Sequence, residues 1–323
     1  MKLKWFSTSF TFIGALIGAG FVSGREIALY FGHTSIFTPI LAGVFLGAFC
    51  YLFLQIGRIT CGNPADLLQK GKPVMEAVVR LSNVVTCCAM VAGSEEAIFA
   101  LFHFHGGGII TSILCLVVVG LGSEKIKLSN FLIVPAIIIM IAVLFFKGHT
   151  VPVSEKMSVY PAFTYCTMNV ISGGYLVSTY SADFNKKDCA VVSAISGTLL
   201  MAILLAVFFV IQNNLDAVMP LMATAEVFQM AKLGYVILYL SIFTTLVTSL
   251  SVAAKNRIPT AIIVTAASLL AATVGFEKIV NNCYPIIGAV GGAVCIIYLI
   301  LYLKRHFSAK IPLNKFLKQR KGT

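Results

Sequence analysis

The sequence predicts an all-α polytopic membrane protein with ten transmembrane helices, arranged as two inverted repeats of five in which the first helix of each repeat is broken. The 323 residues are 59% hydrophobic and 11% charged, with a mean hydropathy of +0.94. This is too apolar for an ordinary water-soluble domain. Long apolar runs recur along the chain, and an offset of about 155 residues superimposes the first half on the second.

The apolar runs are close to the length of about 20 residues that a helix needs to cross a bilayer. Turn and charge signals separate them, such as Gly62-Asn-Pro64 and Asn185-Lys-Lys-Asp188. The ten predicted spans cover residues 5–31, 35–57, 75–104, 108–122, 128–146, 161–182, 189–211, 234–254, 258–274 and 283–303.

The distribution of positive charge predicts the orientation. With ten spans and the N-terminus inside, 18 of the 24 Lys and Arg residues fall on the cytoplasmic side and four fall outside. We therefore expect a multi-pass protein of the cell (inner) membrane with both termini cytoplasmic. The net charge of +12 follows from this asymmetry and from the basic tail, residues 306–323, which can lie on anionic lipid. Nucleic acid is not an expected partner.

The first span carries the strongest local signal. Gly18, Gly20 and Gly24 weaken the helix at membrane depth, and a charged pair, Arg25 and Glu26, follows them. Unpaired backbone is tolerated there only where it is buried in protein or lines a cavity. The alternative is close helix packing through small residues, which does not account for Arg25 and Glu26.

The repeat offset places Gly18 on Gly173 and predicts a second interruption within Asn169–Tyr175. Because five spans is an odd number, the second half enters the membrane from the opposite face. We therefore divide the chain into a first repeat, residues 1–150, and a second, inverted repeat, residues 151–305. Repeats of this kind predict a transporter whose site lies at the midplane, where the two interrupted helices meet.

The run IGAGFVSGRE, residues 17–26, resembles the first-helix signature of the YkvI-like bacterial membrane proteins, a branch of the amino acid-polyamine-organocation superfamily with the LeuT fold. Ala92–Glu96 and the region around Asn169 resemble further landmarks of that branch. The resemblance implies a secondary transporter that rocks a bundle of spans 1, 2, 6 and 7 against a scaffold of spans 3, 4, 8 and 9. Arg25 departs from the family pattern, and we assign it with Glu26 to gating. The alternatives are that Arg25 binds the solute or only pairs with Glu26.

Two sites are expected near the interruptions. Backbone amides at the start of a half-helix favour a carboxylate, so the predicted substrate site comprises Gly18, Ala19, Gly20, Phe21, Tyr165, Asn169, Ser172 and Gly173. An interhelical hydrogen bond without a ligand is the alternative for Asn169. The match to span 8 of the LeuT fold implies a Na+ site formed by the carbonyls of Gly14 and Ile17 with Thr245, Thr248 and Ser249. Hydroxyls bonding back to their own helix are the alternative there.

Glu95 and Glu96 are candidate proton-coupling groups, because a carboxylate within a span is functional by default. We expect them at membrane depth, although Ser94 followed by two acidic residues also fits a helix start. The leading function is cation-coupled symport of a small amino acid-like solute or amine, with Na+ favoured over H+ and no resident cofactor. The alternative is a non-transporting membrane receptor that senses amino acids. No enzyme motif is present.

Overall fold

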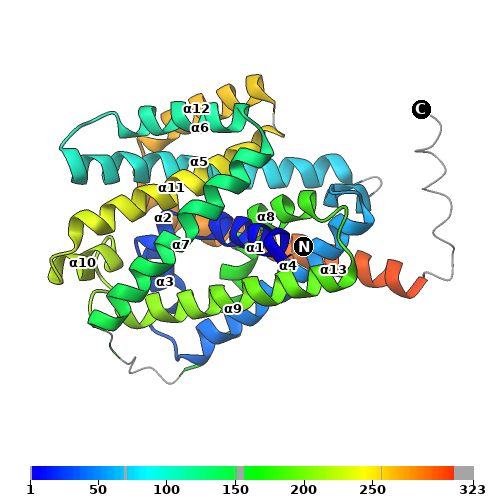
Figure 1. Cartoon of the computed structure of the whole chain (residues 1–323), viewed down its shortest axis with the longest axis horizontal. Coiled ribbons are helices and arrows are strands. Elements are labelled where there is room, and N and C mark those ends of the chain that lie inside the picture. The colour runs from blue at the N-terminus through cyan, green and yellow to red at the C-terminus, as the bar shows by residue number, and fades with distance from the viewer. Residues whose placement is uncertain (1, 69–70, 149, 151–155, 256, 309–323) are drawn as a thin grey trace.

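The computed structural model describes residues 2–68, 71–148, 150, 156–255 and 257–308, and these contain helices but no strand (Figure 1). The helices are α1 (Lys2–Leu16), α2 (Ala19–Val22), α3 (Arg25–Phe31), α4 (Phe37–Ile59), the short 3-10 helix η1 (Pro64–Leu67), α5 (Lys72–Phe102), α6 (Gly107–Gly120), α7 (Ser123–Lys147), α8 (Val159–Tyr180), α9 (Lys186–Val210), α10 (Pro220–Val227), α11 (Ala231–Ala254), α12 (Ile258–Ala272) and α13 (Phe276–Ser308).

The helices agree with the predicted spans in position. Within the described residues, α4, α5, α7, α9, α11 and α13 are long and apolar enough to cross a membrane, and α6 and α12 are shorter apolar helices. The chain is therefore an all-helical, multi-pass membrane protein. The full count of ten crossings stays a prediction. Residues 309–323 of the predicted basic tail lie outside the described residues.

The first span is interrupted at two glycines. Gly18 has an extended backbone (φ −97°, ψ −167°) and separates α1 from α2. Gly24 has φ +81°, in the left-handed region where glycine is favoured, and separates α2 from α3. One carbonyl near this second interruption, that of Ser23, accepts a hydrogen bond from the Leu221 backbone N–H of α10 at 2.8 Å. The short helix α10 thus helps to hold the outer part of the first span.

The predicted interruption of the sixth span is wrong, because α8 is continuous from Val159 to Tyr180. Gly173 and Gly174 serve close packing instead. A Cβ on Gly173 would overlap Leu16 and Phe12 of α1, and a Cβ on Gly174 would overlap Phe53 of α4. Helix α8 therefore keeps its backbone hydrogen bonds and uses its glycines to approach α1 and α4.

The helices form two groups. One group, which we call the bundle, contains α1–α3, α4, α8 and α9, and the other, the scaffold, contains α5, α6, α11 and α12. In Figure 1 the scaffold helices stack in the upper left, while α9 crosses the lower part of the molecule. Counterparts in the two halves contact each other: α1 with α8, α4 with α9, α5 with α11, and α6 with α12. Inverted repeats bring counterparts together in this way, and the division near residue 150 stays a prediction.

Candidate functional site

Hydroxyl groups of α11 face the end of α1 at its interruption. The Ile17 carbonyl accepts hydrogen bonds from Ser241 Oγ at 2.8 Å and Thr245 Oγ1 at 3.3 Å. Thr245 Oγ1 also lies 3.2 Å from the Gly14 carbonyl. The scaffold thus contacts the bundle through the carbonyls at the end of α1.

Thr248 and Ser249 continue the same face of α11. Residues spaced by three, four, seven and eight positions share one side of a helix, so both follow Ser241 and Thr245 along it. Both side chains are buried, and neither hydroxyl has a hydrogen-bond partner among the described residues. Since buried polar groups are rarely left unpaired, these oxygens are candidate ligands for a cation. The five predicted cation ligands therefore come from two contacting helices, α1 and α11.

Sequence reasoning missed two neighbours of this cluster. Asn130 of α7 lies against Gly14, where a Cβ would overlap its amide, and its buried Oδ1 has no partner among the described residues. Ser241 is the second. Its position one helical turn before Thr245 could have identified it, whereas nothing in the sequence places span 5 against Gly14.

The predicted carboxylate cradle at Gly18, Ala19, Gly20 and Phe21 is not an open row of amides. Helix α2 is a single buried turn, and the Ala19 N–H donates to Met90 Sδ of α5 at 3.4 Å. Gly20 is covered by the Glu26 side chain, which a Cβ on Gly20 would overlap. The surroundings of α2 are thus a thioether and a carboxyl group, a setting that suits an anion poorly.

The residues predicted on α8 are divided between several contacts. Asn169 Nδ2 donates to the Tyr165 carbonyl of its own helix at 3.1 Å, so this bond is not the interhelical one of the alternative. Ser172 Oγ donates to Asn83 Oδ1 of α5 at 2.7 Å. The buried Tyr165 packs against the outer part of the first span, where its ring lies 5.0 Å from that of Phe31.

Glu95 and Glu96 lie within α5, which runs unbroken to Phe102, so the alternative that they begin a new helix is wrong, while their depth in the membrane stays a prediction. Glu95 is partly exposed at the connection between α5 and α6, where it accepts backbone hydrogen bonds from Gly106 at 3.0 Å and Gly108 at 2.9 Å. Glu96, on the same helix, is half-buried. Carboxylates commonly satisfy free N–H groups at helix starts. Glu95 therefore joins the end of α5 to the start of α6.

Arg25 and Glu26 do not pair with each other. The Arg25 guanidinium lies 2.9 Å from a Glu277 carboxylate oxygen, 3.2 Å from Asn281 Oδ1 and 3.3 Å from the Ala217 carbonyl. Arg25 therefore ties α3 to the start of α13 and to the loop before α10. Glu26 turns the other way, into the protein interior, with 3% of its surface exposed.

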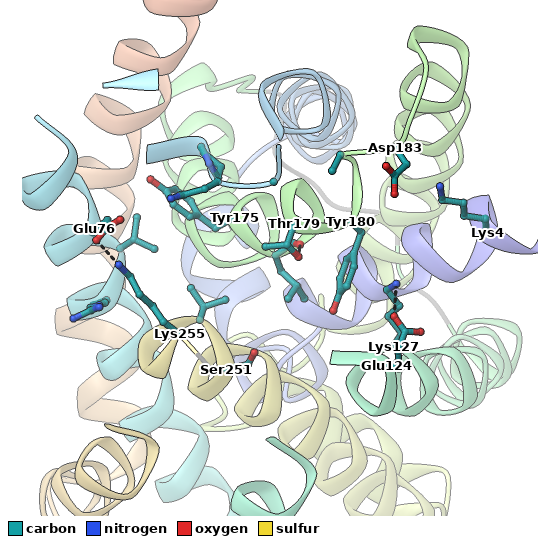
Figure 2. A pocket seen from close by; sticks show the side chains of 18 residues that line it. Lys4, Glu76, Glu124, Lys127, Tyr175, Thr179, Tyr180, Asp183, Ser251 and Lys255 are labelled. Atoms are coloured by element: carbon teal, nitrogen blue, oxygen red, sulfur yellow. Dashed lines mark hydrogen bonds and ion pairs between the residues drawn. The ribbon is translucent and has the colours of Figure 1, made fainter. Parts of the chain in front are cut away.

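A cavity of about 590 Å³ opens at the opposite end of the molecule (Figure 2). The starts of α1, α5 and α7 and the ends of α8 and α11 line it, with charged side chains around it that include the ion pairs Glu76–Lys255 and Glu124–Lys127. Ser251 and Val252 of α11 also line it. Val252 lies one helical turn beyond Thr248, so the cavity leads toward the candidate cation ligands.

Comparison with known proteins gives similarity to solved structures alone, since no family model and no curated protein matches the chain. The chain is similar to Mhp1, a nucleobase-cation-symport-1 family transporter, in a closed conformation with bromovinylhydantoin bound, with a TM-score of 0.59 at 13% identity over 92% of this chain and 76% of that one. It is also similar to the substrate-bound outward-open state of a Na+-coupled sialic acid symporter, with a TM-score of 0.60 at 12% identity over 93% and 78% of the chains.

These likenesses show the fold, which is the LeuT type. Both neighbours are transporters and neither is an enzyme, in agreement with the lack of enzyme motifs in the sequence. The narrower resemblance to the YkvI-like branch stays a prediction.

Proposed function

We propose that this chain is a Na+-coupled symporter of a small amino acid-like solute and works by alternating access. The observation that carries the proposal is the set of oxygens around the end of α1. The carbonyls of Gly14 and Ile17 face α11, which also holds two buried hydroxyls, those of Thr248 and Ser249, without partners among the described residues. Unwound backbone carbonyls and neighbouring hydroxyls are the groups that coordinate Na+ in transporters built from broken helices.

One end of the molecule is closed and the other is open, as alternating access requires. This difference supports a transporter over a receptor that only senses its ligand. Arg25, Glu277 and Asn281 close the end at which α3 and α13 begin, while the cavity opens the other end. The positive-inside rule assigns the open end to the cytoplasm. The molecule then represents an inward-facing state, in which a solute released near α2 leaves through the cavity.

Na+ is preferred over H+ as the coupling ion. Glu95, one of the two glutamates predicted as proton-coupling groups, accepts backbone hydrogen bonds from Gly106 and Gly108 at the start of α6. A Na+ site built from neutral oxygens needs no titrating group.

The test is uptake by the purified protein in liposomes. With an inward Na+ gradient, the protein should accumulate a solute from a panel of small amino acids and amines, and an equal K+ gradient should give no accumulation. Na+-independent accumulation would contradict the choice of ion. Binding without accumulation under any gradient would instead favour the receptor.

A further inference from the structure

Glu26 is the only buried charged side chain among those that the structure describes. Its Oε2 atom has no hydrogen-bond partner there. The nearest guanidinium in sequence, that of Arg25, is engaged with Glu277, Asn281 and Ala217. A buried carboxylate without a cation or hydrogen-bond donors is strongly disfavoured. Glu26 therefore either carries a proton or takes a positively charged partner from outside the described chain.

The space for this carboxyl group is built into the fold. It lies against Gly20 of α2, where any side chain would overlap it. Helix α2 is four residues long, so it spans about 6 Å. The carboxyl group is thus close to the candidate Na+ ligands, with which α2 is continuous through Gly18 and Ile17.

Buried tyrosines come from the helices around the same carboxyl group. Tyr30 lies one helical turn after Glu26 on α3, and Tyr165 and Tyr284 come from α8 and α13, which both contact α3. The rings of Tyr30 and Tyr165 meet edge to face at 5.7 Å. A carboxylate beside aromatic rings is the combination that recognises an ammonium group, through a charge-assisted hydrogen bond and cation–π attraction.

We propose that Glu26, with Tyr30, Tyr165 and Tyr284 around it, binds the positively charged nitrogen of the transported solute. The solute is then an amine, a methylated amine or an amino acid bound through its ammonium group. An acid without a nitrogen is excluded as a ligand of this group, since no described cationic side chain faces it. This inference rests on the proposed transport function and names the class of its solute.

Matched ligands test the proposal on the full-length purified protein. The ammonium series is L-alanine, putrescine, choline and glycine betaine, and the counterparts without nitrogen are L-lactate, propanoate and glycerol. Melting temperature is measured over a titration of each compound in NaCl and again in KCl. We expect at least one ammonium compound to raise the melting temperature, whereas L-lactate, propanoate and glycerol should not.

Glu26→Gln keeps the volume of the side chain and removes its charge, and should weaken binding of that ammonium compound at least about tenfold. Glu26→Asp should retain the preference for ammonium at reduced affinity, and the exposed Glu226→Gln on α10 should bind as the wild type does. Equal affinity in Glu26→Gln, or no response of the wild type to the whole ammonium series, would overturn the proposal. So would a Glu26→Gln variant that loses a response to Na+ while its ammonium binding is intact, because Glu26 would then be a second cation ligand.

The two proposals fail separately. Stabilisation by an ammonium compound that depends on Glu26 but is equal in NaCl and KCl would retain the ammonium site and contradict Na+ coupling. Stabilisation by Na+ with a response to neutral or acidic compounds alone would retain Na+ coupling and overturn the role of Glu26.

Discussion

Single residues around α2 determine what the site can hold. Gly20 provides the space for the Glu26 side chain, so Gly20→Ala should displace the carboxyl group or strain α2, a change that costs about 1–3 kcal/mol when a packed core is overfilled. We expect uptake of the solute to fall at least about tenfold. Gly120→Ala on α6 is the control, because its Cβ would make an ordinary contact with Ile258. Normal uptake by Gly20→Ala would show that the position of Glu26 is not needed.

Sequence could identify some of these residues and not others. Thr245, Thr248 and Ser249 were identified from the match to span 8 of the LeuT fold, and the structure places Thr245 against the carbonyls of Gly14 and Ile17. Asn130 and Met90 were not, since their contacts with Gly14 and Ala19 depend on how separate helices pack. The separation of Arg25 from Glu26 was missed for a related reason: adjacent residues were assigned together to gating, whereas Arg25 pairs with Glu277 and Glu26 is buried in the interior.

At the scale of helices, the same glycine signal has two outcomes. Gly18 and Gly24 interrupt the first span, and partners on α11 and α10 are available for carbonyls beside them. Gly173 and Gly174 leave α8 intact because large side chains of α1 and α4 fill the space above them. The glycines can be read from the sequence, but the groups that pack against them or bond to the neighbouring carbonyls cannot. The repeat therefore located the sixth span correctly but predicted an interruption that α8 does not have. The contacts of Glu95 were equally out of reach, because they depend on where the α5–α6 connection folds back.

The contact of α3 with α13 should control the closed end. Arg25→Ala removes the hydrogen bonds to Glu277, Asn281 and Ala217. A partly exposed ion pair contributes up to about 1 kcal/mol, so hydrogen exchange in residues 212–221 and 276–284 should become roughly fivefold faster. Lys255→Ala breaks the Glu76–Lys255 pair at the other end and is the control. Unchanged exchange in Arg25→Ala would remove this contact from the gating mechanism.

For the whole molecule, orientation in the membrane decides which end faces the cytoplasm. Exposed Asn213, near the closed end, and exposed Lys187, at the start of α9, should lie on opposite sides. Single cysteines at these positions, in a background in which the exposed Cys61 is replaced by Ser, can be tested with an impermeant maleimide on intact cells. We expect labelling at position 213 and none at 187 until the membrane is opened. Labelling at position 187 and none at 213 would mean that the cavity opens to the outside of the cell, contrary to the predicted orientation.

If the bundle rocks against the scaffold, coupling to an ion requires an ion-binding contact at the boundary between the two groups of helices. The α1–α11 contact is such a boundary, because carbonyls of one group face hydroxyls of the other. Na+ bound there would hold the groups in one arrangement, and its loss would release them. The central claim is therefore that Na+ binds between α1 and α11.

Binding of radioactive 22Na+ to the purified protein, measured against competing unlabelled Na+ or K+, tests this claim most directly. The wild type should show saturable binding that Na+ displaces and K+ does not, and the double variant Thr248→Val/Ser249→Ala should lose it. Both variant and wild type should fold equally well, because the hydroxyls removed have no partner among the described residues. Thr265→Val removes another buried, unpartnered hydroxyl, on α12, and should leave Na+ binding intact. Equal saturable Na+ binding by the wild type and the double variant would contradict the account.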